Sequence, residues 1–290
     1  MKIIVNMACG LANRMFQYSY YLFLKKNGYD ASVDFYQSAK LAHEKVSWND
    51  IFPVAKINQA SRADIFWLGG GDSFFSKVRR KFFPALCRVV NMPTAFDAPL
   101  PVNDGSDKYL IGVFQNAASV EAVEEDVRAC FSFVPFSDNF NIGVEQELRE
   151  CMSVGIHVRK GKDYMSRIWY QDTCPVKYYR DAITKIRELV DNPKFFVFTD
   201  NPQWVKENFT DIDYCLIEGN PADGWGSHFD MQLMSLCKHN IISNSTYSWW
   251  GAFLNENKNK IVICPEIWFN PASCEEYTSD RLLCKNWIAI

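Results

Sequence analysis

The sequence predicts an α/β fold in two parts, because strand and helix patterns alternate along the chain in two separate runs. The first run opens the chain, where the apolar segment "KIIVNM" is followed by a loop and a helical pattern. The second run starts near residue 150, where short β-rich segments alternate with helical ones. A chain of 290 residues suits two domains of ordinary size. We therefore predict an N-terminal α/β domain over residues 1–150 and a C-terminal α/β domain over residues 151–290.

The first elements predict a parallel β-α-β unit. After "KIIVNM", the small-residue segment "ACGLANR" reads as a loop, and "MFQYSYYLFLKKNGY" has the apolar spacing of a helix that ends at Gly28. "DASVDF" then reads as a second strand, which a parallel crossover would place beside the first. The loop lacks the spacing of a dinucleotide-binding GxGxxG motif and the lysine of a P-loop, so neither of those enzyme classes is supported.

A basic, aromatic segment lies in the less regular region that follows. "SFFSKVRRKFF" combines the four cations Lys77, Arg79, Arg80 and Lys81 with four phenylalanines. Such a segment could lie on a membrane surface or bind an anionic glycan. The interpretation we favour from the sequence is a helix with one solvated basic face and one aromatic face packed on the protein, because short amphipathic helices are common in globular domains.

The second half predicts a doubly wound parallel sheet. Five β-rich runs ("MSVGIHV", "KFFVFTD", "YCLIEG", "HNIISNS" and "KIVICP") alternate for the most part with helical patterns such as "CPVKYYRDAITKIRELV" and "FDMQLMSLCKH". No Gly/Ser-rich linker marks the boundary near residue 150.

The composition limits the classes of partner. A net charge of -3 and a pI near 5.9 argue against nucleic-acid binding, which needs a strongly positive face. The ten cysteines are scattered without CxxC or zinc-like spacing, which predicts reduced thiols. Polar residues interrupt the apolar N-terminus, and no later stretch has membrane-spanning length. We expect a cytoplasmic protein.

Three polar segments follow strands of the second half and should converge on one edge of its sheet, where ligands bind in such folds. They are "GIHVRKGKDY", "FTDN" and "SNSTYSWWGA". An arginine fork and a helix N-terminus both suit phosphate oxygens. Arg159, with the N–H groups and hydroxyls of Ser245, Thr246 and Ser248, would make a pyrophosphate clamp, and a helix is expected to start near Ser248.

Other polar residues at the same edge could accept hydrogen bonds from a sugar or a nucleobase. These candidates are Thr199, Asp200 and Asp230. Each has a structural alternative, since "TDN" is also an ordinary turn with a helix N-cap. The pair Asp211 and Asp213 spells the DxD element that holds a divalent cation in some glycosyltransferases, but two acidic residues in a loop are usually only solvated.

The combined motifs resemble the bacterial α-1,2-fucosyltransferases of glycosyltransferase family 11. "CGLANRMFQYSYY" resembles the opening GGLGNQMFQYA signature of the family, and "GIHVRKGKDY" resembles its HVRRGDY motif. "FVFTDNPQWVKENF" is similar to the strand-to-helix passage FSDDxEWVKxN, and "DMQLMSLCKHNIISNSTYSWWGAFLN" is close to the carboxyl-terminal block. The motifs occur in family order and cover most of the chain.

This resemblance implies an inverting transferase of the GT-B fold, with two Rossmann-like domains whose parallel sheets face a cleft. It implies transfer of L-fucose from GDP-fucose to the 2-hydroxyl of a terminal β-galactose in an oligosaccharide or lipid-linked glycan. The resemblance implies that no metal is needed. No cofactor is expected either, because GDP-fucose is a co-substrate. Assembly of surface polysaccharide is the implied process, with peripheral contact at the inner face of the cytoplasmic membrane as a further hypothesis.

The resemblance also implies roles for particular residues. His157 and Arg159 stand at the donor-binding HxR positions, with Arg159 as the partner of the β-phosphate. The other positions matched to donor binding are Asn13, Gln17, Asp200, Asp230, Asn244, Ser245 and Thr246. The proton of the acceptor hydroxyl could pass to Asp163, Asp200, Asp230, His157 or the leaving phosphate, and for each residue we favour a donor-orienting hydrogen bond.

The chain departs from the family pattern at several positions. Cys9 and Ala12 replace glycines, Arg14 replaces a glutamine, and "KGKD" at 160–163 is one residue longer than RGD. These departures could weaken the activity or change the acceptor. Two alternatives from other classes also stay open. One is a carbohydrate-binding protein without transfer activity, and the other is a nucleotide-sugar enzyme of another type with a metal-dependent mechanism.

Overall fold

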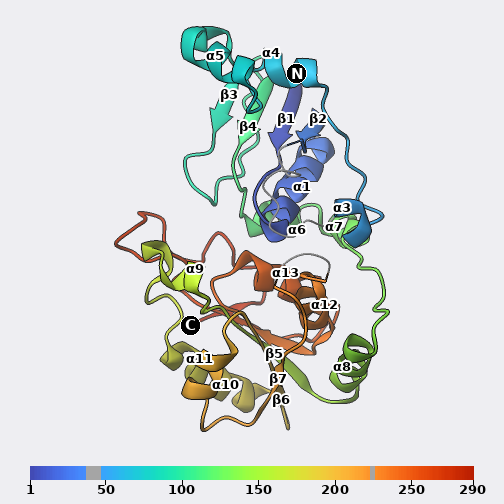
Figure 1. The fold of residues 1–290 in the computed structure, drawn as a ribbon, viewed down its shortest axis with the longest axis vertical. Helices are drawn as coiled ribbons and strands as arrows, with labels where there is room; N and C mark the ends of the chain where they lie inside the picture. The colour runs from blue at the N-terminus through green and yellow to red at the C-terminus, as the bar shows by residue number, and fades with distance from the viewer. Residues whose placement is uncertain (37–46, 223–225) are drawn as a thin grey trace. The chain divides into compact units, whose positions relative to one another are not determined.

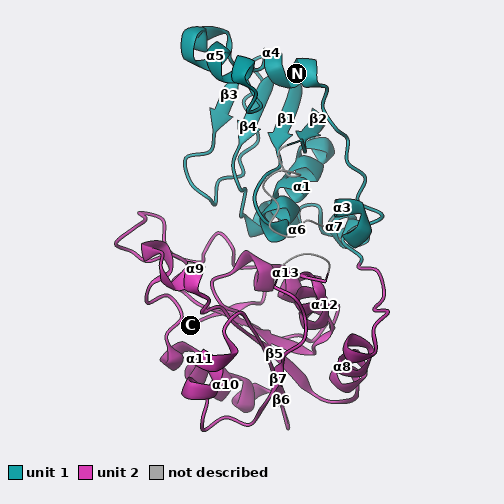
Figure 2. Cartoon of the chain, in the orientation of Figure 1, with its two compact units in different colours: residues 1–132 teal, residues 133–290 magenta. Residues whose placement is uncertain are grey.

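The structure is a computed structural model, and it describes residues 1–36, 47–222 and 226–290. The chain divides into two compact units, Met1–Ser132 and Phe133–Ile290 (Figure 2). Each unit has its own parallel sheet and its own apolar core.

The division between the units falls earlier than the boundary near residue 150 that the sequence suggested. Helix α8 (Asn139–Glu150) packs against α12 (Phe229–Leu236), so its contacts belong to the second unit. The side-chain amides of Asn141 and Asn220 also exchange two hydrogen bonds of 2.9 Å each. These contacts join α8 to residues far along the chain and leave no local signal in the sequence.

The sheet of the first unit has four parallel strands in the order β2-β1-β4-β3. The predicted parallel pairing of the first two strands is confirmed, with Lys2 opposite Asp30 and Asn6 opposite Asp34. The strands are β1 (Lys2–Asn6), β2 (Asp30–Asp34), β3 (Val89–Asn91) and β4 (Lys108–Ile111).

Helix α1 (Leu11–Lys26) forms the crossover between β1 and β2 (Figure 1). Its apolar side chains are almost all buried, so the helix is held by the core rather than by a side-chain cap. The helix ends at Lys26, two residues before the predicted end at Gly28, and Gly28 takes the left-handed conformation (φ +82°) that glycine adopts at low cost. The other helical segments are α3 (Trp48–Ile51), α4 (Arg62–Trp67), α5 (Phe74–Phe82), η1 (Pro84–Leu86), α6 (Ala117–Glu121) and α7 (Glu124–Cys130).

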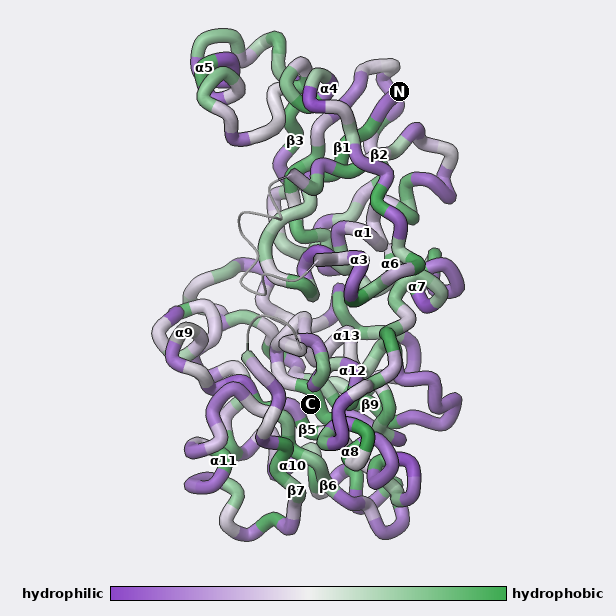
Figure 3. Tube along the Cα trace, turned by 45° about the vertical axis from the view of Figure 1, so that its right-hand side comes forward, coloured by the Kyte–Doolittle hydropathy of each residue, from purple (hydrophilic) through white to green (hydrophobic). Residues whose placement is uncertain are grey.

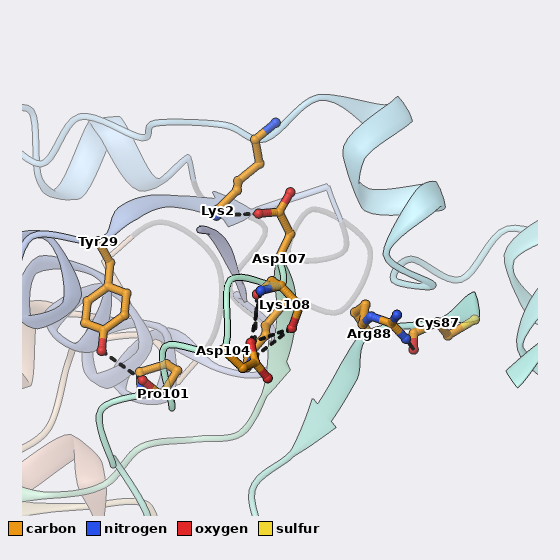
Figure 4. A network of polar contacts seen from close by, with 9 residues as sticks. Lys2, Tyr29, Cys87, Arg88, Pro101, Asp104, Asp107 and Lys108 are labelled. Atoms are coloured by element: carbon orange, nitrogen blue, oxygen red, sulfur yellow. Dashed lines mark hydrogen bonds and ion pairs between the residues drawn. The ribbon is translucent and has the colours of Figure 1, made fainter. Parts of the chain in front are cut away.

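The segment between β3 and β4 is held to the sheet by polar contacts (Figure 4). Tyr29 Oη donates to Pro101 O at 2.8 Å, and the backbone N–H of Lys2 donates to Asp107 Oδ1 at 2.6 Å. Lys108 Nζ donates to Asp104 Oδ1 at 2.6 Å. These bonds fix a long connection that has no secondary structure of its own.

Helix α5 contradicts the favoured interpretation of "SFFSKVRRKFF". A helix does form there, but the side chains of Phe74 and Phe75 are 75% and 71% exposed. The polar residue Ser76 is the one that is buried. The aromatic face therefore points to solvent, because the unit's core contacts the opposite side of the helix.

The sheet of the second unit has six parallel strands in the order β10-β9-β8-β5-β6-β7, which confirms the predicted parallel sheet. The strands are β5 (Ser153–Val158), β6 (Lys194–Thr199), β7 (Tyr214–Ile217), β8 (His239–Ile241), β9 (Val262–Cys264) and β10 (Ile288–Ala289). The remaining helical segments are α9 (Lys162–Met165), η2 (Ile168–Tyr170), α10 (Val176–Leu189), α11 (Pro202–Asn208) and α13 (Thr246–Leu254).

Strand β5 shows how this sheet is covered on both faces. Alternate residues Val154, Ile156 and Val158 pack in a core cluster with side chains of α10. Gly155 lies on the opposite face, where an added Cβ would lie 2.9 Å from Cys237 Sγ. Successive side chains alternate along a strand, so His157 also lies on this second face, the face covered by α12 and α13.

All ten cysteines are free thiols, as the spacing predicted. Of the helices in the described ranges, none combines the length and apolar content needed to cross a membrane.

Candidate functional site

The carboxyl ends of β5, β6 and β8 meet at one edge of the second sheet, because the three strands are neighbours and parallel. The structure brings together the segments that the sequence singled out there. Residues 159–161 follow β5, residues 200–201 follow β6, and residues 242–245 follow β8 and lead into α13.

His157 is buried near the end of β5. Its Nδ1 lies 2.8 Å from Ser243 Oγ, and its ring packs against the ring of Tyr247 with 5.9 Å between centroids. Burial, with a smaller effect from the nearby Arg159 cation, lowers the pKa of His157 from 6.5 to about 3. The imidazole is therefore neutral at physiological pH. It is a poor proton acceptor and suits a hydrogen-bonding or positioning role.

Arg159 is partly exposed and lies at the start of the loop after β5. Its Nη1 donates to Ser245 Oγ at 3.4 Å, and its guanidinium lies 5.6 Å from the centre of the Tyr164 ring. Tyr164 is itself stacked on Tyr170 at 4.6 Å. A planar fork placed on an aromatic ring and beside a helix start is well suited to bind phosphate oxygens.

Helix α13 begins at Thr246, two residues before the predicted start at Ser248. The hydroxyl of Ser248 donates back to Ser245 O at 3.2 Å, within the first turn. Ser245 is the N-cap residue and makes no side-chain cap bond, so its hydroxyl is used toward Arg159. The nine-residue helix thus presents its N-terminus beside the guanidinium.

Asp200 holds two loops together. Its Oδ1 accepts from the backbone N–H of Lys160 at 2.7 Å, and the neighbouring Asn201 Nδ2 donates to Lys160 O at 2.8 Å. Thr199 Oγ1 accepts from the Asn201 backbone N–H at 3.0 Å. The pair Thr199 and Asp200 therefore shapes the edge of the site through its contacts with the backbone.

Lys160 is a site feature that the sequence alone did not single out. Its side chain is only 6% exposed, and its Nζ lies 5.8 Å from the Tyr164 ring centre and 5.4 Å from that of Trp204. Burial lowers its pKa. The signal was present as the second cation of "HVRKGKDY", which ends in Tyr164, but nothing local in the sequence indicated Trp204.

Asn244 was assigned to donor binding by resemblance, and the structure shows it committed to internal bonds. Its Oδ1 accepts from Tyr164 Oη, and its Nδ2 donates to Trp268 O at 2.9 Å. Tyr164 Oη also lies 2.9 Å from Thr173 Oγ1. Asn244 thus positions the ring that lies under Arg159.

Asp230 lies in the first turn of α12, on the His157 face of the sheet. Burial raises its pKa to about 6, partly offset by a hydrogen bond of 2.8 Å from Asn220 Nδ2. The next residue, Met231, donates its N–H to Tyr247 Oη at 2.9 Å. Tyr247 therefore connects the start of α12 to the ring of His157.

Three predicted residues lie outside the segments described so far. Asp163 lies in α9, and its side chain is outside the described part of the structure. Asn13 and Gln17 belong to α1 in the first unit. Gln17 is buried, and its amide accepts from the Ala8 N–H and donates to the Gly112 carbonyl at 2.8 Å each, which holds the loop after β1.

Asn13 accepts a bond of 3.1 Å from Gln115 Nε2 in the same unit. Cys9, which stands where the resembled family has glycine, has φ +73°. This left-handed conformation explains a preference for glycine at the position.

A cavity of about 240 Å³ lies in the first unit, at the carboxyl ends of β1, β3 and β4. Its lining includes Asn6, Asn91, Asp72, Arg80 and Tyr109. One acid, one base, two amides and one aromatic ring would suit a neutral polar ligand such as a sugar. The cavity leaves no local signal in the sequence, because its walls come from five separate segments.

Within the described ranges, no group of three or more His, Cys, Asp or Glu side chains is arranged to hold a metal. Asp211 of the DxD letters instead forms an exposed ion pair of 2.9 Å with Arg180.

Comparisons with known proteins identify the family of the chain. The model of the family described as glycosyl transferase family 11 matches residues 98–290. An alpha-1,2-colitosyltransferase of Escherichia coli is 29% identical over 99% of this chain and 98% of that protein. Galactoside alpha-(1,2)-fucosyltransferase 2 of Mus musculus is 30% identical over 35% of this chain and 30% of its own length.

Among solved structures, fucosyltransferase NodZ from Bradyrhizobium matches with a TM-score of 0.50 and 14% sequence identity. The match covers 86% of this chain and 91% of that one. The likeness shows the fold, which is the predicted GT-B type with two Rossmann-like α/β domains.

Proposed function

Because the chain belongs to glycosyl transferase family 11, we propose that it transfers L-fucose from GDP-fucose to the 2-hydroxyl of a terminal β-galactose, with inversion. The observation that carries this proposal is the placement of Arg159 beside Ser245 at the N-terminus of α13. That placement puts a bidentate cation and a helix dipole at the strand ends where an α/β domain binds its ligand.

In the proposed reaction the acceptor oxygen forms a bond to the anomeric carbon as the bond from that carbon to the β-phosphate oxygen breaks. Negative charge then grows on the departing GDP. Arg159 and the N–H groups at the start of α13 stabilise that charge without needing to reorganise. Asn244 acts indirectly, because it holds the Tyr164 ring that contacts the guanidinium of Arg159.

Asp230 is proposed as a hydrogen-bond acceptor for the donor rather than as the base. Guanine presents its N1–H and 2-amino group side by side, which matches the two oxygens of a carboxylate. His157 is neutral and its Nδ1 is occupied by Ser243, so it serves to position the same pocket. The acceptor proton passes to solvent or to the leaving phosphate late in the reaction.

We propose that the acceptor sugar occupies the cavity of the first unit, whose amide and aromatic lining supports binding of a neutral polyol. We also propose that no divalent metal is required. The support is that Arg159 and α13 supply the positive charge that a metal would otherwise bring to the diphosphate, while Asp211 is paired with Arg180 on the surface.

A second donor is favoured by a specific observation. The similarity to the E. coli alpha-1,2-colitosyltransferase extends over 99% of this chain. Colitose is fucose without its 3-hydroxyl, so one site could accept either sugar, and the choice would depend on whether a protein group pairs with that hydroxyl.

The test measures GDP release and product linkage with lactose as acceptor, GDP-fucose or GDP-colitose as donor, and EDTA present throughout. A 2-linked fucosyl product supports the main proposal, and a product only from GDP-colitose replaces the donor. Activity that appears only when Mn²⁺ or Mg²⁺ is restored rejects metal independence. Glycan binding without any GDP-sugar binding would identify a carbohydrate-binding protein instead. Replacing both Asp211 and Asp213 by Asn should leave turnover unchanged.

A further inference from the structure

The outer side of α4, α5 and η1 carries a group of exposed apolar side chains, which we call the α5 face. Phe74, Phe75 and Phe82 are 75%, 71% and 64% exposed, although residues of this size are usually at least half buried. The full set is Trp67, Phe74, Phe75, Phe82, Phe83 and Leu86. In unit 1 this region lies at the periphery, beyond β3, and its trace carries both apolar and polar colours (Figure 3).

Helix α5 is oriented with its polar side toward the protein. At 3.6 residues per turn, Phe74, Val78, Phe82 and Phe75 fall within an arc of about 100°. Ser76 lies on the opposite side and is only 3% exposed. Arg80, on that same side, donates to the carbonyls of Gly69 and Gly71 at 2.7 Å each. These bonds fix the helix so that its aromatic arc must point outward.

Cations surround the aromatic arc. Lys77 and Lys81 are exposed and one turn apart, at the edge of the arc, and Lys81 Nζ lies 5.6 Å from the Phe82 ring. Arg79 connects α4 to η1, because its Nη2 donates to Trp67 O and Leu86 O at 3.0 and 3.1 Å. Residues 73–96 hold five Lys and Arg and no Asp or Glu, a local charge of +5 in a chain of net charge -3.

We propose that the α5 face docks on an anionic lipid bilayer, with the aromatic side chains at the boundary of headgroups and acyl chains and the lysines among the headgroups. An exposed apolar arc flanked by cations is the pattern of helices that lie in a membrane interface. Both parts of the pattern are satisfied at such a surface. The apolar side chains leave water, and each Lys or Arg near an anionic surface contributes about 1 kcal/mol to the binding free energy.

The charge argues against a second copy of the chain as the occupant. A symmetric dimer through this face would place the two +5 segments against each other, and like charges brought together cost free energy. An anionic glycan would satisfy the lysines but would leave the six apolar side chains in water.

The proposal goes beyond the transfer reaction and links the face to substrate access. Arg80 lies on the inner side of α5 and also lines the cavity of about 240 Å³ in the same unit. Docking through the outer side of α5 would hold that cavity close to the bilayer, where the glycan of a lipid-linked acceptor projects.

The experiment is flotation of the full chain with two kinds of vesicle. One contains phosphatidylglycerol and phosphatidylcholine in equal amounts, and the other contains phosphatidylcholine alone. Three double variants are compared with the wild type. Two are tests, Phe74→Ser/Phe75→Ser and Lys77→Gln/Lys81→Gln. The third, Val102→Ser/Lys185→Gln, is a control whose residues are exposed elsewhere. Thermal unfolding checks that each variant is folded.

We expect the wild type and the control to float with the anionic vesicles and to bind less as salt is added. Each of the two test pairs should lower the partition coefficient at least about tenfold. Equal flotation of all variants, or no flotation of the wild type, overturns the proposal. The proposal is also overturned if the wild type sediments as a dimer and the double variant Phe74→Ser/Phe75→Ser sediments as a monomer. None of these readouts uses transfer activity, so failure of the proposed reaction is seen separately.

Discussion

His157 Nδ1 lies 2.8 Å from Ser243 Oγ, although 86 positions separate the two residues in the sequence. The contact exists because β5 and β8 are adjacent parallel strands, with Ile156 opposite Ile241. It joins strand β5, which ends one residue before Arg159, to the segment between β8 and α13 that carries Ser245. Because His157 is neutral at this contact, the free energy of unfolding should depend on pH.

His157→Gln should make the free energy of unfolding less sensitive to a fall in pH. In the unfolded chain the histidine pKa is 6.5, and in the fold it is about 3. Between these values only the unfolded state takes up the proton, so stability falls as pH drops below 6.5. From pH 6.5 to pH 5 the wild type should lose about 2 kcal/mol more than the variant.

Urea unfolding of both proteins at pH 7 and pH 5 measures this difference. The comparison must be between the two proteins, because Asp230 has a raised pKa and acts in the opposite direction as pH falls through 6. A difference in unfolding free energy between wild type and variant that is the same at both pH values would show that His157 takes up its proton in the fold as readily as in the unfolded chain.

Arg159→Lys should lower kcat by about 100-fold or more, nearly as much as Arg159→Ala. Lysine keeps the positive charge but loses the planar fork and the contact with the Tyr164 ring. Initial rates with GDP-fucose and lactose measure this, with Arg149→Lys on the exposed side of α8 as the matched control. Turnover near the wild-type rate would reject the clamp, provided that the variant melts like the wild type.

Asn91→Ala should raise the KM for the acceptor several-fold, up to about tenfold, and leave the KM for GDP-fucose unchanged. The amide lines the unit 1 cavity, and loss of one hydrogen bond to a sugar costs about 1 kcal/mol. Two-substrate kinetics separate the two constants. Asn259→Ala, in an exposed loop of the second unit, serves as control. An effect on the GDP-fucose constant alone would mean that this cavity does not hold the acceptor.

The parallel sheet of the second unit and the meeting of Arg159 and Ser245 at its edge could be anticipated from local patterns. Strand β5 is buried along its whole length and its sequence SVGIHV reads as a strand, so the polar residues that follow it had to lie at the sheet edge. The same logic places Arg159 and Ser245 together from the sequence alone, because each follows a strand of one parallel sheet.

What could not be anticipated depended on contacts between distant segments. Asn244 looked available to a ligand because nothing in its own motif shows that Tyr164 and Trp268 occupy its amide. The contacts of Gln17 could not be anticipated for the same reason, since its partners Ala8 and Gly112 lie on different segments. The orientation of α5 was also hidden, because its amphipathic pattern is the same whichever side faces the core.

Cys9→Gly should stabilise the protein by up to about 1 kcal/mol. Cys9 has φ +73°, and a left-handed conformation costs a residue with a Cβ roughly 1–2 kcal/mol, part of which glycine loses again through the flexibility of the unfolded chain. Chemical denaturation measures the change. Cys9→Ala is the matched control, because it removes the thiol and keeps the Cβ, and it should bring no gain. Equal stability of the two variants would contradict the argument from strain.

Asp230 and Asn220 give the sharpest test of the donor pocket. If the Asp230 carboxylate accepts hydrogen bonds from GDP-fucose, the Kd should rise as pH falls through about 6, by up to about tenfold per pH unit. Asp230→Asn should bind weakly at every pH. Asn220→Ala removes the donor that lowers the pKa of Asp230, so the rise in Kd should begin at a higher pH.

Titration calorimetry from pH 5 to pH 8 measures these curves, with Asp181→Asn on the exposed side of α10 as control. GDP-fucose is the ligand of choice, because GDP carries a terminal phosphate that itself titrates near pH 6. A wild-type curve that is flat across this range would remove Asp230 from the donor pocket. A curve that Asn220→Ala fails to shift would show that another group is responsible for the pH dependence.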